Sequence, residues 1–158
     1  MTLYFVLKFL HVIGAAVLLG TGAGIAFFMV VAHLGRDARV IAGVARIVVL
    51  ADFLFTATAV LAQPVTGVLL VREMGYSLSD FWIAASIGLY VITGCFWLPV
   101  VWMQMQMREL AKRAITDGGP LPERYHRLFR LWFWFGFPAF AAVLAIFWLM
   151  ITRPVHLL

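Results

Sequence analysis

The stretch FLHVIGAAVLLGTGAGIAFFMVVA, residues 9–32, decides the fold of this protein. Its 24 residues include no Asp, Glu, Lys or Arg, and a helix needs roughly 20 residues to cross the hydrocarbon core of a bilayer. Lipid offers the backbone no hydrogen-bond partners, so a continuous apolar segment of this length satisfies its N–H and C=O groups as an α-helix. The stretch is also longer than the apolar region of a secretory signal peptide, which spans about 7 to 15 residues. We therefore expect it to be retained as a transmembrane helix.

Three further stretches have the same character: residues 47–71, 81–107 and 131–152, in which Asp52 is the only charged side chain. Over the whole chain of 158 residues, 65% are hydrophobic and only 12% are charged, which is too little charge to cover a soluble globule of this size. The sequence predicts a single domain over residues 1–158, an all-α integral membrane protein in which four transmembrane helices form a bundle. This composition argues against a soluble enzyme, and no phosphate-binding glycine loop, nucleophile elbow, zinc spacing or nucleic-acid module is present.

Basic residues predict the orientation of the four spans, because Lys and Arg beside a span resist translocation. The two connections that share one side carry nine of them, and the opposite side carries three. The nine are Arg36, Arg39, Arg46, Arg108, Lys112, Arg113, Arg124, Arg127 and Arg130, and the three are Lys8, Arg72 and Arg153. We expect both termini outside, on the periplasmic side, and the basic connections in the cytoplasm.

Polar side chains inside two of the spans each share one helical face, at about 100° per residue. Both faces are predicted to turn inward as polar seams. The first seam holds Asp52, Thr56, Gln63 and Thr66, and the second holds Ser86, Tyr90, Thr93, Trp97 and Gln104.

His11 is the leading candidate ligand, because an ionisable group inside a span is by default a functional hypothesis. A neutral imidazole beside small residues suits haem iron, and Lys8, Arg72 and Arg153 at the same membrane surface would balance the propionates. The alternatives are a histidine that hydrogen-bonds a neighbouring helix and a Lys8 that extends to the headgroups. His33 lies 22 residues further on, about 33 Å of helix, so the two imidazoles lie at opposite surfaces.

Asp52 is the other costly group, since a carboxylate at the centre of a span costs about 2.5 to 3.5 kcal/mol unless it is paired or protonated. We expect a structural ion pair with Arg127 or Arg130, ahead of a proton-relay role. Gln63 precedes Pro64, so its amide is predicted either to cap carbonyls freed by the proline or to bind a ligand.

Two weaker patterns concern copper and self-association. Met103, Met105 and Met107 invite copper handling, but their i, i+2, i+4 spacing spreads them around a helix, which favours packing. Gly20 and Gly24 form a G-x-x-x-G motif, which indicates helix association within the bundle or with a second copy in a homodimer.

The chain resembles the bacterial predicted integral membrane proteins grouped as domain of unknown function 2269 (DUF2269), over nearly its whole length. This resemblance implies a four-span protein of the bacterial inner membrane and no settled activity. The segments that carry it are residues 7–14, 20–33, 45–52, 63–67, 97–102 and 124–127.

More distantly, Lys8-x-x-His11 followed by Gly22, Gly24 and His33 is similar to the opening of HemJ-type protoporphyrinogen oxidases, which are haem-b membrane proteins. That similarity implies that His11 is an axial ligand. The third-span lysine ligand and the Pro-Arg of that family are absent here, where Phe27-Phe28-Met29 stands in place of Pro-Arg, so it implies haem binding without the oxidase reaction. CopD-type copper-resistance membrane proteins are a second distant resemblance.

Our hypothesis is a membrane protein that binds haem b and serves electron transfer or quinone-linked oxidoreduction, with a quinone or a redox partner protein as its reaction partner. His11 would bind the iron, and Gln63 and Tyr90 would line its distal side. The alternatives are a cofactor-free membrane protein that acts in partner binding or assembly, and copper handling.

Overall fold

The structure, a computed structural model, describes residues 2–154, and within this range it consists of helices and short connections. Four helical segments are long and apolar enough to cross a membrane, which confirms the four-helix membrane architecture. The second is continuous through one π-helical turn. The elements are α1 (Thr2–Leu34), α2 (Ala38–Ala51), η1 (Asp52–Thr56), α3 (Ala57–Met74), α4 (Phe81–Asp117) and α5 (Glu123–Thr152).

Local capping interactions account for several helix boundaries. The Asp37 side chain accepts a hydrogen bond from Arg39 N at 2.7 Å and caps the start of α2. Gly75 and Gly118 end α3 and α4 with φ of 70° and 63°, a left-handed conformation that glycine adopts without a Cβ penalty. Helix α4 therefore ends at Asp117, directly before Gly118.

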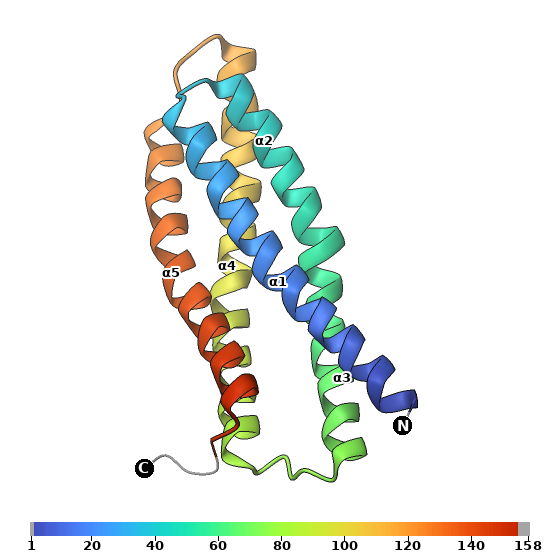
Figure 1. Cartoon of the computed structure of the whole chain (residues 1–158). Helices are drawn as coiled ribbons and strands as arrows, with labels where there is room; N and C mark the ends of the chain where they lie inside the picture. Colours follow the sequence, from blue (N-terminus) through green and yellow to red (C-terminus); the bar gives the residue numbers. More distant parts are fainter. Residues whose placement is uncertain (1, 155–158) are drawn as a thin grey trace.

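The helices are longer than the predicted spans. Helix α4 has 37 residues, or about 55 Å, so its last turns extend beyond a hydrocarbon core of about 30 Å. They do so at the end of the bundle that holds connections 35–37 and 118–122, here called the basic end. The opposite end holds the N-terminus and the connection 75–80 (Figure 1) and is called the termini end.

The packed core lies toward the basic end, where α1, α2, α4 and α5 meet. Met103 and Met107 are buried in it, whereas Met105 points outward with 37% of its surface exposed. The prediction that the methionine spacing serves packing rather than convergence is confirmed. The cluster consists of Ile25, Met29, Ala32, Ile41, Ala42, Ala45, Val48, Met103, Met107, Ala111, Tyr125, Leu128, Phe129 and Trp132.

Toward the termini end the helices associate in two pairs, α1 with α3 and α4 with α5 (Figure 1). Many large apolar side chains of both pairs are exposed, for example Phe9, Leu61 and Trp148. Such surfaces are unfavourable in water and suit the acyl chains of a bilayer. Because the two pairs are largely separate here, the polar seam on α4, which was predicted to turn inward, contacts α3 at few places in this half of the bundle.

Candidate functional site

His11 faces α3 in the pair formed by α1 and α3. Its Nδ1 lies 2.9 Å from Thr66 Oγ1, and the Thr66 hydroxyl donates to the Ala62 carbonyl oxygen, also at 2.9 Å. Because the hydroxyl proton is used there, the Thr66 oxygen accepts from His11 Nδ1–H. This arrangement selects the tautomer of His11 in which Nε2 carries the free lone pair.

Gln63 forms the second contact between the same two helices. Its amide nitrogen donates to the main-chain oxygen of His11 at 2.9 Å, and its side chain is buried. Gly14 makes room for this amide, since a Cβ there would lie 2.9 Å from Gln63 Nε2. Gly67 makes room for the imidazole, since a Cβ there would lie 3.3 Å from His11 Cε1. We call these residues, His11, Gly14, Gln63, Thr66 and Gly67, the His11 cluster.

Tyr90, which is predicted to line the distal side of a bound haem, directs its hydroxyl at α3. Its hydroxyl donates to the main-chain oxygen of Val60. Val60 lies four residues before Pro64, which has no N–H to offer this carbonyl. Tyr90 therefore caps the carbonyl that the proline frees, and Gln63, for which that role was one prediction, bonds α1 instead.

The three basic residues of the termini end do not converge on His11 through any contact within residues 2–154. The Lys8 ammonium lies 5.5 Å from the centre of the Tyr4 ring, and Arg72 is exposed. Arg153 donates to Tyr76 Oη at 3.2 Å and so joins the end of α5 to the connection 75–80.

Asp52, at the start of η1, is almost fully buried, with 3% of its surface exposed. Trp97 Nε1 donates to its Oδ1 at 3.3 Å. With the Gln104 amide oriented so that both of its ends are paired, its nitrogen donates to Asp52 Oδ2 at 2.6 Å and its oxygen accepts from Trp132 Nε1 at 3.2 Å. We call Asp52, Trp97, Gln104 and Trp132 the Asp52 network.

The predicted ion pair of Asp52 with Arg127 or Arg130 is wrong. Arg130 lies 3.7 Å from Glu123, and Arg127 is exposed. The physical reason is that α5 begins at Glu123 and presents the indole of Trp132, rather than a guanidinium, toward the level of the carboxylate. No basic side chain within residues 2–154 lies within ion-pair distance of Asp52.

Two features beside Asp52 were not predicted from the sequence. The first is the π turn, in which Ala57 N–H donates to the Asp52 main-chain oxygen five residues earlier; such turns are frequent at functional sites. The second is the Thr56 hydroxyl, which lies beside the same carboxylate and has no hydrogen-bond partner among the residues that the structure describes. The sequence did hold a signal for this network, because Asp52 and Thr56 share one helical face and Trp97 and Gln104 share another.

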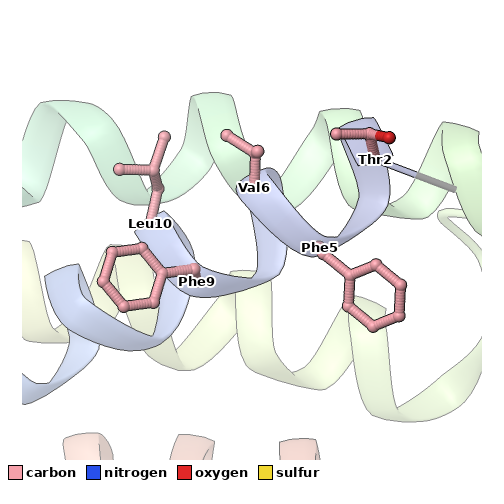
Figure 2. Close-up of a pocket in the computed structure, with 5 residues that line it drawn as sticks. All are labelled: Thr2, Phe5, Val6, Phe9 and Leu10. Carbon is pink, nitrogen blue, oxygen red and sulfur yellow. The ribbon is translucent and has the colours of Figure 1, made fainter.

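The remaining candidate features have weaker structural support than the His11 cluster and the Asp52 network. Gly20 and Gly24 make no close contact with another helix, because an added Cβ would meet nothing at Gly20 and only Phe28 of the same helix at Gly24. Figure 2 shows an apolar hollow on α1 lined by Thr2, Phe5, Val6, Phe9 and Leu10, which includes none of the predicted ligands. Within residues 2–154 no three His, Cys, Asp or Glu side chains are grouped as a metal site.

Comparison with known protein families gives a match over nearly the whole chain. Residues 5–154 match the family described as predicted integral membrane protein (DUF2269). No curated protein and no solved structure matches the chain.

Proposed function

We propose, from the premise that this chain belongs to the predicted integral membrane protein family DUF2269, that it binds haem b through His11. The observation that carries this proposal is the hydrogen bond between His11 Nδ1 and Thr66. Histidines that ligate metals almost always donate their other ring N–H to a protein acceptor, which orients the ring and raises its basicity. In the His11 cluster, Nε2 is left with the lone pair that an iron ligand needs.

Of the predicted ligands, His11 alone would be free to hold the iron. Gln63 and Tyr90 already bond the main-chain oxygens of His11 and Val60, so neither is available to the iron without giving up that bond. A single histidine ligand is sufficient for haem b in other protein classes. Lys8 and Arg72, both exposed at the termini end, would hold propionates.

Bound haem would supply one-electron chemistry, which suits electron transfer or quinone-linked oxidoreduction in the bilayer. The chain's own contribution would be to orient the imidazole through Thr66 and to supply positive charge at the membrane surface. The orientation expected from the basic residues places this site near the periplasmic face of the bacterial inner membrane.

An absorption spectrum tests this proposal. The protein is purified in mild detergent, supplemented with haem b and recorded with and without dithionite. We expect a Soret band that responds to dithionite in the wild type and is lost in His11→Ala, with retention of helical circular dichroism in both proteins. His126→Ala, at the basic end, is the matched control and should keep the band. A wild type that stays colourless would overturn the proposal.

The second candidate is a cofactor-free membrane protein that binds partners or supports assembly. It is favoured by the close fit of Gly14 against Gln63 and of Gly67 against His11, which is the packing that small residues permit between membrane helices. Here the His11 cluster only joins α1 to α3. A colourless wild type whose stability falls on His11→Ala would support this candidate.

Association of two copies through Gly20 and Gly24 belongs to the same proposal. The Gly20 backbone is exposed, so a second helix would approach it closely without displacing a neighbour. Crosslinking in membranes should detect a dimer that Gly20→Leu abolishes and Gly22→Leu, on another face, retains.

A further inference from the structure

We propose that Asp52 is a proton-binding site within the membrane, independent of any haem at His11. The site consists of the Asp52 carboxylate, its donors Trp97 and Gln104, and the Thr56 hydroxyl beside it. The carboxylate is buried and accepts hydrogen bonds from Trp97 and Gln104, and within residues 2–154 it has no ion-pair partner.

The carboxylate is buried without a cation. Only 3% of the surface of Asp52 is exposed, and its partners are the neutral N–H groups of Trp97 and Gln104. A charge taken out of water without an opposite charge is unfavourable, and a group that can neutralise itself does so. Proton uptake forms one O–H bond on the carboxylate and removes its negative charge, and the aqueous phase supplies the proton and takes it back.

The neighbouring helices offer no competing charge at this depth. Between Phe81 and Met107 on α4, and between Leu131 and Thr152 on α5, the sequence contains no charged residue. The titratable groups there are Tyr90, which bonds Val60, and Cys95, which is exposed.

Of the titratable and charged groups on the remaining elements packed against η1, the nearest to Asp52 along the chain is Arg46, six residues before it. Helix α1 carries His11, which bonds Thr66 of α3 about 14 residues beyond Asp52, or about 21 Å of helix. Arg46 of α2 is exposed. Asp52 is therefore the group at this level that can gain or lose a proton.

The Thr56 hydroxyl is the remaining polar group beside the carboxylate. Its oxygen is buried and makes no hydrogen bond within the described residues, and a hydroxyl can donate to an ionised carboxylate or accept from a protonated acid. The π turn sets this spacing, because it widens the helix at Asp52–Thr56. Thr56 can therefore pair with Asp52 in either protonation state by exchanging the roles of donor and acceptor.

A proton fits this site better than a metal cation. Hard cations require about six or more oxygen ligands, whereas two of the groups around the carboxylate are N–H donors directed at its oxygens. An N–H donor repels a cation. A proton needs only one carboxylate lone pair.

Infrared difference spectroscopy tests the proposal on the full chain in nanodiscs of uncharged lipid. We expect the carboxylic acid C=O band of a buried acid to appear reversibly as the pH falls, and Asp52→Asn to abolish it. Asp117→Asn, which alters an exposed carboxylate at the end of α4, is the matched control and should leave the band unchanged. A band that survives in Asp52→Asn, or no titrating band in the folded wild type, would overturn the proposal.

A second variant keeps the test decisive if Asp52→Asn does not fold. Thr56→Val removes the hydroxyl beside the acid, and we expect the C=O band to keep titrating but to move to higher frequency, because the carbonyl stretch of an acid rises when the acid loses a hydrogen bond. An unchanged band position would contradict the role of Thr56. Repeating the titration in sodium chloride and in choline chloride should give the same midpoint, and a sodium-dependent midpoint would assign the site to a metal cation instead.

Discussion

Tyr90 of α4 donates its hydroxyl proton to the main-chain oxygen of Val60, the acceptor that Pro64 leaves without a helical partner. This bond joins α3 to α4 in the half of the bundle where the two helix pairs otherwise have few contacts. A proline and a tyrosine on different helices thus form one structural unit.

We predict that Tyr90→Phe lowers the free energy of unfolding by about 1 to 2 kcal/mol, because the Val60 carbonyl loses its partner in an apolar environment. In a Pro64→Ala background the restored N–H of residue 64 pairs with Val60, so the same substitution should cost less than about 0.5 kcal/mol. A double-mutant cycle of unfolding in detergent measures the difference. Equal costs in both backgrounds would show that Tyr90 does not act as the cap.

Gly14→Ala is expected to weaken the contact between α1 and α3. The added Cβ would lie 2.9 Å from Gln63 Nε2, so the amide must move and lose its bond to the His11 main-chain oxygen. The expected cost is about 1 kcal/mol, the value of one hydrogen bond. Gly88→Ala, where a Cβ meets nothing within 4 Å, should be neutral or stabilising, and a Gly14→Ala protein as stable as this control would refute the prediction.

Thr66→Val tests the orientation of the His11 ring. If haem binds through His11, loss of the bond to Nδ1 should weaken haem binding by about 10-fold to 100-fold, the usual effect of removing such a partner. Haem titration monitored at the Soret band measures this. Thr93→Val is the control, because Thr93 bonds the Leu89 carbonyl of its own helix, as Thr66 bonds that of Ala62, but has no histidine partner. Equal losses in both variants would assign the effect to helix distortion.

The orientation of the bundle is tested by single cysteines in a Cys95→Ser background. We expect an impermeant thiol reagent added to intact cells to label Ser79→Cys, in the connection 75–80 at the termini end, and to spare Gly119→Cys, in the connection 118–122. The reason is the excess of Lys and Arg at the basic end. The reverse labelling pattern would place the termini in the cytoplasm.

The sequence predicted the features that depend on one helix alone, such as which polar residues share a face. It predicted the contacts between helices only in part. The pairing of His11 with a neighbouring helix was one of the alternatives open from sequence, and Thr66 already shared a face with Gln63. The partner of Asp52 was predicted wrongly, because depth alone suggested an arginine near the start of α5. Depth does not specify rotation, and the rotation of α5 directs Trp132 inward.

The sequence by itself determined the number, type and order of the spans, because the bilayer imposes helical backbone pairing on any apolar run of sufficient length. The helix boundaries at Asp37, Gly75 and Gly118 also follow from local chemistry, because these residues act on their own backbone, although the helices extend beyond the predicted spans. Only the tertiary structure decided which polar groups meet, such as Asp52 with Gln104. Those contacts depend on the rotation and crossing of helices far apart in the chain, which side-chain packing sets and periodicity does not encode.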